Sequence, residues 1–378
     1  MLILGIESSC DETAAAVVRD GEQLLSNVVS SQITTHLPYG GVVPELASRE
    51  HLRAIVPVVR EAATRAAVSL EQVDAFAVTQ GPGLAGSLLV GITYAKALSF
   101  ALSKPLIAVN HLEGHIHAVL LEHRQSSNAD IALPALALVV SGGHTHLYMV
   151  SRSEPTQWSY LNVGHTLDDA AGEAFDKAAK LLALSYPGGP IIEALAKHGN
   201  PHAIAMPRSQ IKAHEKRRSR GENAQKRYDF SFSGIKTAVL RFVETHQMKN
   251  SIERRRRAVA DFPDPRPEDF LPHLDPLTLD LIASFQEAVV KDLVGKSLRA
   301  AEELEVETLI VSGGVASNER LRSEFVKQAG SEGIKVFFPS RGLSTDNAAM
   351  IAAAAYPKLL ARDFATEHFS AEASLALG

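Results

Sequence analysis

Two short apolar stretches near the start of the chain are separated by a polar one. Residues 2–7 and 14–18 are largely apolar, whereas residues 8–13 are small, hydroxyl-bearing or acidic. Short apolar runs bounded by polar residues are typical of buried strands joined by a turn. The tip of this hairpin could offer backbone N–H groups to phosphate oxygens. Asp11 or Glu12 could hold a metal ion or a water, although an ordinary hairpin loop has the same composition.

The same pattern returns in the middle of the chain. Apolar residues 135–140 precede the turn Ser141-Gly-Gly-His-Thr145, and residues 146–150 form a return strand. Two such units, one in each half, predict an internal repeat of two lobes. Their turns would face each other, with the backbone amides of both directed at the phosphates of one ligand.

Further strands and helices lie between these two units. Strand-like residues 73–79 lead through the glycine-rich turn 80–87 into a helix that ends near residue 102, and residues 105–109 form another short strand. The turn matches neither the G-x-G-x-x-G fingerprint nor a Walker loop, so close helix packing accounts for its glycines. Ligands of open α/β sheets commonly bind at the carboxyl ends of strands. The residues after 109 are therefore candidates for a site.

His111 and His115 follow the strand at 105–109 and are four residues apart. In a helix, which Ala118-Val-Leu-Leu121 favours, both imidazoles project from one face and could hold one metal ion. The metalloprotease helix H-E-x-x-H has similar spacing, but Glu113 lies about 200° around the helix from His111 and points away from such an ion. Spacing alone supports a pair of packed or solvated histidines equally well, so a third ligand is required.

Length, charge and cysteine content narrow the class of protein. At 378 residues the chain exceeds one typical core, so we expect two lobes. A net charge of -5 excludes a uniformly basic nucleic-acid binder but not a local basic patch. The single cysteine, Cys10, cannot form an internal disulfide, which is typical of a reducing compartment. With no signal-type leader and no apolar run that reaches bilayer length, we expect a cytoplasmic protein without a membrane span.

Polar residues mark the starts of two further helices. Glu45, Arg49, Glu50 and His51 lie at the start of a helix at 46–67, and we interpret them mainly as a solvated face that could contact a partner subunit or a substrate. Asp346 lies at the start of an alanine-rich helix, where an aspartate is usually a cap.

Basic residues gather in two segments of the second half. One cluster comprises Lys212, Lys216, Arg217, Arg218, Arg220, Lys226 and Arg227. The other, Arg254-Arg-Arg-Arg257, belongs to residues 243–279, which we interpret as a charged surface insertion outside the core. If either cluster contacts RNA phosphates, affinity should fall steeply with salt.

A series of motifs, taken in order, resembles one known family. The motifs are Gly5-Ile-Glu-Ser-Ser-Cys-Asp-Glu-Thr13, Gly40-Gly-Val-Val-Pro-Glu-Leu-Ala-Ser-Arg49, Gly81-Pro-Gly-Leu84, His111-Leu-Glu-Gly-His115, Val140-Ser-Gly-Gly-His-Thr145, Asp168-Asp-Ala-Ala-Gly-Glu-Ala-Phe-Asp-Lys177, Tyr186-Pro-Gly-Gly-Pro190, Phe230-Ser-Phe-Ser-Gly-Ile-Lys236, Ser312-Gly-Gly-Val315 and Ser344-Thr-Asp-Asn347. Together they resemble the tRNA threonylcarbamoyladenosine transferase (TsaD) family, whose archaeal and eukaryotic members belong to the KEOPS complex. The resemblance covers nearly the whole chain and is to the bacterial type.

The resemblance implies a fold and a reaction. The fold is the actin-like ATPase fold of sugar kinases and heat-shock chaperones, an α/β fold of two lobes around a nucleotide cleft. We expect an N-terminal lobe at 1–121, a C-terminal lobe at 131–345, and a helix at 346–378 that returns towards the first lobe. The reaction transfers a threonylcarbamoyl group from threonylcarbamoyl-AMP to N6 of the adenosine 3′ of the anticodon in tRNAs that read ANN codons.

The resemblance also assigns residues to a site. His111, His115 and Asp346 would hold one divalent metal ion, Fe(II) in first place and Zn in second, since a two-histidine, one-carboxylate set suits both. Nucleotide contacts, with Mg²⁺ as a further candidate ion, are implied for Val139, Val140, Ser141, Gly142, Gly143, Asp176, Gly189, Glu193 and Asn318. Asp11 or Glu12 is the candidate group that orients or deprotonates the attacking amine.

The implied partners are tRNA, a paralogous TsaB-like subunit, a small TsaE-like ATPase and the threonylcarbamoyl-AMP synthase that supplies the donor. Two other functions agree with parts of the sequence. A metallopeptidase is suggested by the histidine pair but opposed by the position of Glu113. A non-catalytic ATP-binding scaffold agrees with the fold and would need no metal.

Overall fold

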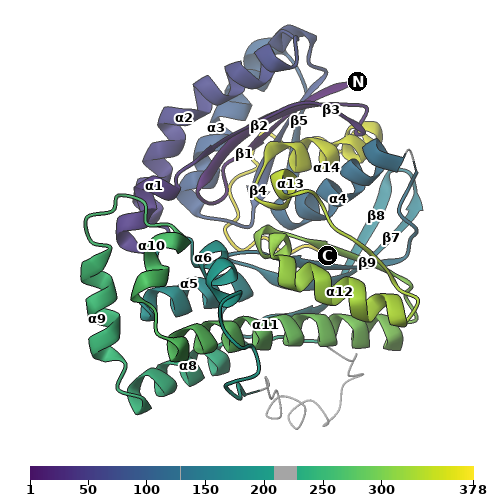
Figure 1. The fold of residues 1–378 in the computed structure, drawn as a ribbon. Coiled ribbons are helices and arrows are strands. Elements are labelled where there is room, and N and C mark those ends of the chain that lie inside the picture. Colours follow the sequence, from purple (N-terminus) through teal and green to yellow (C-terminus); the bar gives the residue numbers. More distant parts are fainter. Residues whose placement is uncertain (128, 208–227) are drawn as a thin grey trace.

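The computed structural model describes residues 1–127, 129–207 and 228–378. The predicted basic cluster at 212–227 lies outside these residues. The described chain forms two α/β lobes, each built on a five-stranded sheet (Figure 1).

The first sheet has the strand order β3-β2-β1-β4-β5. Its members are β1 Leu2–Glu7, β2 Glu12–Arg19, β3 Gln23–Ser31, β4 Ala75–Gly81 and β5 Leu106–Asn110. β1, β2 and β3 form an antiparallel meander, and β4 and β5 run parallel to β1. The predicted first hairpin is therefore confirmed, whereas β3 was not expected from the sequence.

Helices cover both faces of this sheet. They are α1 Ile33–His36, α2 Pro44–Arg65, α3 Ala85–Leu102, α4 His111–Ser127 and, from the end of the chain, α14 Ala348–Ala361. Side chains alternate along a strand, so Leu4 and Ile6 pack against α2 and α3, while Ile3 packs towards α4 and α14. Gly5 lets α14 approach closely, because a Cβ there would lie 2.5 Å from the carbonyl oxygen of Ala348.

The second sheet has the strand order β10-β9-β6-β7-β8, with β6, β7 and β8 antiparallel and β9 and β10 parallel to β6. Its strands are β6 Ala135–Val140, β7 Thr145–Glu154, β8 Gln157–His165, β9 Thr308–Ser312 and β10 Lys335–Phe337. This is the arrangement of the first sheet with β6 in the place of β1. The internal repeat predicted from the two hairpins is confirmed.

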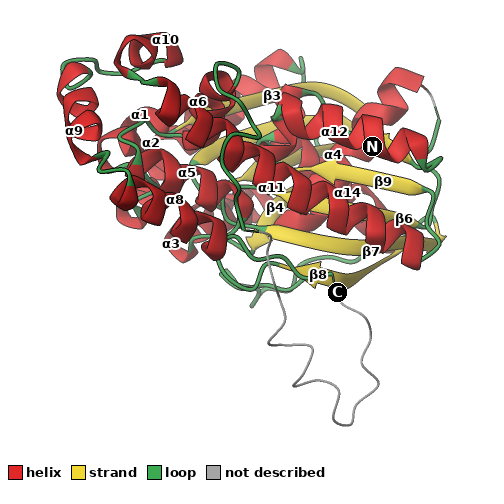
Figure 2. Ribbon diagram, turned by 60° about the horizontal axis from the view of Figure 1, so that its bottom comes forward, coloured by secondary structure: helices red, strands yellow, loops and turns green. Residues whose placement is uncertain are grey.

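Most of the remaining helices pack around this second sheet, whereas α9 and α10 lie at the outer edge of the molecule near α1 (Figures 1 and 2). They are α5 Ala171–Leu181, α6 Gly188–Ala196, α8 Ser233–Thr245, α9 Lys249–Ala258, α10 Pro267–Phe270, α11 Pro276–Glu303, α12 Glu319–Ser331 and α13 Arg341–Ser344. The long helix α11 contributes many of the side chains in the largest apolar core, which also includes residues of α5, α6, α8 and α12.

The segment 243–279 is not purely a surface insertion. Ile252 and Arg255 lie three residues apart on one face of α9, and both side chains are buried, as is Phe270. Nη1 of Arg255 donates a hydrogen bond to the carbonyl oxygen of Leu182 at the end of α5. The expectation that this segment lies outside the core is therefore wrong for these side chains, because one side of α9 packs against the lobe.

Helix α3 contradicts the expectation that no apolar run of the chain reaches the length of a bilayer. Over its 18 residues the mean hydropathy is 1.4, so its length and composition would allow it to cross a membrane. This is a weak indication, since core helices pass the same test. In the structure α3 packs against α2 and β4.

Candidate metal and nucleotide site

Three side chains from distant parts of the sequence meet between the lobes. His111 and His115 occupy the first turns of α4, and Asp346 directly precedes the N-cap of α14. Their ligand atoms all lie within 4.8 Å of one another. Nε2 of His111 and Nε2 of His115 lie 3.6 Å and 3.2 Å from Oδ1 of Asp346. The structure thus brings together all three predicted metal ligands.

Asp346 is available because another residue caps the helix. The N-cap of α14 is Asn347, whose side-chain oxygen accepts a hydrogen bond from the backbone N–H of Met350 at 3.1 Å. The carboxylate of Asp346 is therefore directed at the two histidines. The expectation that Asp346 caps the helix is wrong, because Asn347 does so.

Glu7, at the end of β1, is a member of the site that the sequence analysis missed. Its Oε2 lies 3.1 Å from Nδ1 of His111 and accepts a hydrogen bond from the hydroxyl of Thr79 at 2.7 Å. An ionised carboxylate only accepts, so Nδ1 of His111 carries a proton, and Nε2 is the ring nitrogen that faces Asp346 and could bind a metal ion. Carboxylates that orient metal-binding histidines in this way are common. The sequence contained one signal for Glu7, namely that it is an acidic residue at the end of an otherwise apolar strand.

The charges at this point favour a cation. Burial alone would lower the pKa of His111, but the carboxylates of Asp346 and Glu7 outweigh it and raise that pKa to about 9. Burial would also raise the pKa of Asp346, but His111 and His115 hold it below its usual range. A positive charge held between these groups is stabilised by both carboxylates, whether a proton or a metal ion supplies it.

The donor set fits a divalent metal ion. His115 is fully buried, and neither ring nitrogen has a hydrogen-bond partner among the described residues, although Nε2 faces the carboxylate of Asp346. A buried imidazole without a hydrogen bond is costly unless another ligand satisfies it. Two imidazoles and one carboxylate leave coordination positions open, as catalytic zinc and non-haem iron sites do.

The loop between β1 and β2 approaches the metal set from the first lobe. Burial, with Asp346 nearby, raises the pKa of Asp11, and burial together with Asp11 raises that of Glu12 well above its usual value. His51 holds the loop in place, since its Nε2 lies 3.0 Å from the carbonyl oxygen of Cys10 and its Nδ1 lies 2.7 Å from the hydroxyl of Thr13. The interpretation of His51 as part of a solvated face is wrong, because it is buried between α2 and this loop.

The second lobe presents the turn Ser141 to His144, directly after β6. The N–H of Ser141 donates to the carbonyl oxygen of His144 at 2.8 Å, which closes a tight turn. Gly142 and Gly143 are exposed, and a Cβ on either would meet no atom within 4 Å. The start of α5 abuts this turn, because a Cβ on Gly172 would lie 2.6 Å from the carbonyl oxygen of Ser141. A turn with free amides beside a helix N-terminus suits a phosphate group.

The other predicted nucleotide residues lie around this turn in different roles. The side chains of Val139 and Val140 are buried in the sheet, so only their backbone could contact a ligand. Asp176 accepts a hydrogen bond from the N–H of Gly188 at 2.7 Å, and burial raises its pKa to about 6. Gly189 faces open space, since a Cβ there would meet no atom within 4 Å.

Glu193 and Asn318 both support the start of α12. Glu193 accepts a hydrogen bond from the N–H of Glu319 at 2.7 Å, and Asn318 caps the helix by accepting one from the N–H of Leu321 at 3.0 Å. The side-chain amide of Asn318 also donates to Gln286 at 2.9 Å. The side chains of these two residues are therefore committed to local structure in this arrangement.

Residues of the two lobes meet at the site. The hydroxyl of Tyr186 lies 3.5 Å from Oδ2 of Asp11, and the rings of His111 and His144 lie 6.0 Å apart. His144 was not predicted, although it follows the glycine pair directly. The acidic loop, the metal set and the glycine turn thus lie around one region between the lobes.

The third histidine of α4, His117, does not belong to this set. Its Nε2 lies 2.8 Å from the hydroxyl of Tyr160, on β8 of the second lobe. Burial and the neighbouring Lys358, Arg124 and Arg152 lower the pKa of His117 to about 3, so it is uncharged at neutral pH.

The fold identifies the structural class of the chain. The described chain has the two lobes with matching sheets of the actin-like ATPase fold, as predicted. Among solved structures, full-length HypF in its phosphate- and nucleotide-bound form aligns with a TM-score of 0.53 at 13% identity, over 95% of this chain and 46% of that chain. At this identity the likeness concerns the fold alone.

The family follows from sequence comparison. Residues 23–353 match the family described as TsaD, tRNA N6-adenosine threonylcarbamoyltransferase. The protein of that name from Koribacter versatilis (strain Ellin345) is 63% identical over 100% of this chain and 99% of its own length. The one from Syntrophobacter fumaroxidans is 51% identical over 94% of each chain. The chain belongs to this family, so it is a tRNA-modifying transferase, and the metallopeptidase and scaffold alternatives are not favoured.

Proposed function

We propose that the chain transfers the threonylcarbamoyl group of threonylcarbamoyl-AMP to N6 of the adenosine 3′ of the anticodon in ANN-decoding tRNAs, at the site around His111, His115 and Asp346. The observation that carries the proposal is the convergence of these three ligands beside an acidic loop and an open glycine turn. Within the family, this geometry supports a metal-assisted acyl transfer and not nucleotide binding alone.

The second lobe would hold the leaving group. The free amides of Gly142 and Gly143, with the start of α5, would bind the phosphate of the donor, while the N–H of Ser141 holds the turn closed through His144. The start of α5 abuts this turn, and Asp176 of α5 binds the N–H of Gly188 at the start of α6, so Asp176 and Gly189 would contact the nucleoside part. Holding the AMP moiety fixes the direction in which the carbamoyl carbon faces the first lobe.

The first lobe would act on the incoming amine. In the reaction, the nitrogen N6 forms a bond to the carbamoyl carbon, the bond from that carbon to the phosphate oxygen breaks, and one proton leaves the amine. Asp11 and Glu12 are the candidate acceptors of this proton, since a carboxylate of raised pKa is a stronger base near neutral pH. His51 would keep the loop in register through Cys10 and Thr13.

His111, His115 and Asp346 would hold the metal ion, Fe(II) as the first candidate and Zn as the second. When bound, such an ion supplies Lewis-acid polarisation of an acyl oxygen. The residues of the chain determine its position: Glu7 orients His111, and Asn347 leaves Asp346 free by capping α14.

Metal removal tests this function directly. Protein stripped with a chelator should lose at least about 100-fold in transfer of labelled threonylcarbamoyl from preformed threonylcarbamoyl-AMP to tRNA, because a metal's charge stabilisation is worth several kcal/mol. Fe(II) added without oxygen, or Zn, should restore the activity. Transfer that survives stripping would contradict the metal-assisted mechanism. Peptide cleavage restored by the metal, with no labelled tRNA, would favour a peptidase.

We propose that exposed apolar residues of α2 and α3 form the surface that binds a paralogous TsaB-like subunit. The two helices pack side by side (Figure 1). Leu52, Leu89 and Phe100 are 65%, 50% and 90% exposed. Exposed apolar side chains on adjacent helices are typical of interaction surfaces. We place the protein in the cytoplasm, with tRNA, a TsaE-like ATPase and a threonylcarbamoyl-AMP synthase as its functional partners.

Leu52→Glu should weaken binding of the TsaB-like subunit at least about tenfold, as loss of a central apolar contact does. The equivalent change Leu240→Glu, on α8 of the other lobe, is the control and should leave binding unchanged. Binding constants from titration calorimetry measure both. If both variants bind the TsaB-like subunit with equal affinity, the partner surface does not lie on α2.

A further inference from the structure

Helices α8 and α9 form a hairpin that concentrates positive charge. Residues 233–258, which comprise the two helices and the turn between them, contain seven lysines and arginines and two glutamates. The whole chain has a net charge of -5. The hairpin is therefore a local positive region on an otherwise acidic protein. None of its residues belongs to the proposed metal or nucleotide site, so its charge requires a separate explanation.

The packing of the hairpin turns most of this charge outward. Ile235, Val239 and Ile252 are among its apolar side chains that are buried in the core of the second lobe. Lys236 binds Asp169 at 2.7 Å. Five basic side chains are instead exposed, namely Arg241, Lys249, Arg254, Arg256 and Arg257.

The exposed charge is only partly neutralised. Arg256 and Arg257 share one partner, Glu253, at 2.7 Å and 3.3 Å. The other three basic side chains form no ion pair with any residue that the structure describes: Arg241, Lys249 and Arg254. The outer face of the hairpin thus keeps an excess of positive charge.

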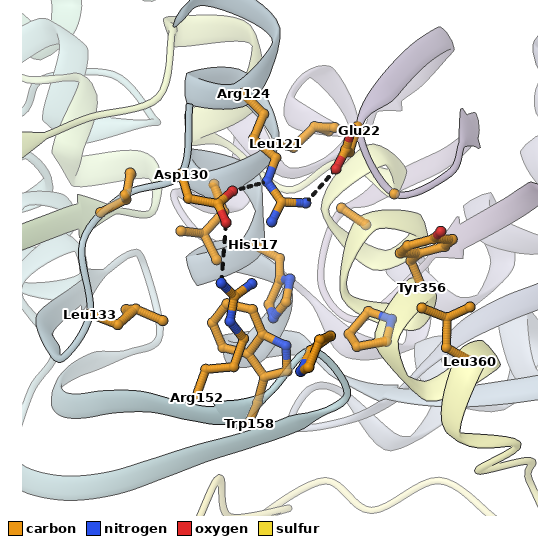
Figure 3. Close-up of a pocket in the computed structure, with 16 residues that line it drawn as sticks. Glu22, His117, Leu121, Arg124, Asp130, Leu133, Arg152, Trp158, Tyr356 and Leu360 are labelled. Carbon is orange, nitrogen blue, oxygen red and sulfur yellow. Dashed lines mark hydrogen bonds and ion pairs between the residues drawn. The ribbon is translucent and has the colours of Figure 1, made fainter. Parts of the chain in front are cut away.

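A pair of arginines beside α4 shows the contrast (Figure 3). Arg124 binds Glu22 at 2.9 Å and Asp130 at 2.5 Å, and Arg152 binds the other oxygen of Asp130 at 3.1 Å. Two guanidinium groups meet two carboxylates there, so no positive charge is left to attract an anion. The arginines of the hairpin are not compensated in this way.

Arg255 anchors the basic helix α9 close to the candidate site. Its side chain is fully buried, and Nη1 donates a hydrogen bond to the carbonyl oxygen of Leu182, at the C-terminal end of α5. The last carbonyls of a helix carry partial negative charge, so a guanidinium group there is stabilised. α9 is therefore held against α5, whose first turn abuts the glycine turn.

The residues around Leu182 connect α9 to the first lobe. Nζ of Lys180 donates to the carbonyl oxygen of Tyr39 at 3.2 Å. The hydroxyl of Tyr186 lies 3.5 Å from Oδ2 of Asp11, in the acidic loop. Tyr186 is four residues from Leu182, a span of at most about 14 Å. The basic helix thus lies on the side of the molecule where the acidic loop meets the second lobe, near α1 (Figure 1).

We propose that the exposed face of the α8–α9 hairpin binds the phosphate backbone of the tRNA whose adenosine enters the site. Lysines and arginines that neutralise phosphates supply much of the affinity for nucleic acid. A chain of net negative charge repels RNA unless a local positive region directs the approach. With the adenosine between the lobes, phosphates of the flanking nucleotides would pass over this side of the molecule. The inference rests on the proposed function, for which it supplies the substrate-binding surface.

Two double variants of equal charge test this surface. Lys249→Gln with Arg254→Gln removes two unpaired charges from α9. Lys327→Gln with Lys335→Gln removes two exposed charges from α12 and β10, away from α9 (Figure 1). Both variants change the net charge by the same amount, so any difference between them depends on position. Fluorescence anisotropy of a labelled ANN-decoding tRNA, with the metal-loaded full chain and no donor, gives the dissociation constant at several salt concentrations.

The α9 variant should bind tRNA at least about tenfold more weakly than the wild type at low salt. The slope of the logarithm of affinity against the logarithm of salt concentration should fall by about 1 to 2, because each phosphate contact contributes about 0.7 to 0.9. In the transfer assay, KM for tRNA should rise while kcat at saturating tRNA is kept. The α12 and β10 variant should resemble the wild type, and thermal unfolding confirms that each variant is folded.

Three results would each overturn the proposal. The first is wild-type affinity and salt dependence in the α9 variant. The second is an equal loss in both variants, which would indicate a general effect of net charge. The third is unchanged tRNA binding with weakened binding of the TsaB-like or TsaE-like protein, which would assign the surface to a protein partner. Because tRNA binding is measured without the donor, absence of transfer by the wild type would contradict the proposed function alone.

Discussion

Replacing Asp346 by alanine is expected to lower threonylcarbamoyl transfer to tRNA by at least about 100-fold. Loss of a group that merely orients a metal ligand typically costs 10–100-fold in affinity or activity, and Asp346 is the only carboxylate of the three-member set. Its removal also leaves His111 and His115 with no opposing charge at Nε2. Transfer from preformed threonylcarbamoyl-AMP and metal content after dialysis measure the two consequences separately.

Asp363→Ala provides the matched control, because this carboxylate lies in an exposed position after the end of α14. It should keep both wild-type activity and bound metal. An Asp346→Ala protein that retains metal and transfers at the wild-type rate would remove the three-residue set from the mechanism. The same two measurements on His111→Ala and His115→Ala should agree with those on Asp346→Ala, since the three act as one unit.

Glu7→Gln is expected to weaken metal binding by about 10–100-fold, with a corresponding loss of transfer at limiting metal. Glutamine has nearly the same shape, and its oxygen can still accept from His111 and Thr79, but it lacks the charge that stabilises a cation here, and its NH2 group cannot accept from the N–H of Ser9 as Oε1 of Glu7 does. Excess metal should therefore restore much of the activity. Such rescue separates a weakened metal site from a damaged catalytic group.

Two comparisons make the Glu7 result interpretable. Glu61→Gln changes an exposed carboxylate of α2 and should affect neither metal affinity nor transfer. Thr79→Val removes one hydrogen bond to Glu7 while keeping its charge, so its effect should be smaller than that of Glu7→Gln. Metal affinity in Glu7→Gln equal to that of the wild type would show that Glu7 stabilises the fold and not the metal.

Local patterns in the sequence predicted the parts of the site that depend on one element. The spacing of His111 and His115 is sufficient to place both rings on one helix face, and the structure has them there. The two hairpins with polar tips likewise follow from short-range alternation of apolar and polar residues. These predictions needed no knowledge of how the lobes pack.

The remaining parts depend on contacts between segments that are distant in the sequence. An aspartate at the start of a helix is expected to cap it. Asp346 instead faces the histidines, because Asn347 caps α14 and α14 packs against α4. Glu7 and His51 acquire their roles from partners on other elements, His111 and Cys10. Arg255 is charged, and charged residues usually lie on the surface, but its side chain is buried because α9 packs against the end of α5. No local pattern contains this information; the resemblance to the family supplied Asp346.

The matching strand orders of the two sheets bear on how such a metal set could arise. In each order the fifth strand in sequence, β5 or β10, is an edge strand, and the helix with metal ligands at its start follows it: α4 with the histidines, α14 with the aspartate. The two ligand groups thus occupy equivalent positions in two copies of one topological unit. One unit supplies two of the three ligands and the other supplies one, so neither unit contains a complete site, and the set exists only where both units pack together.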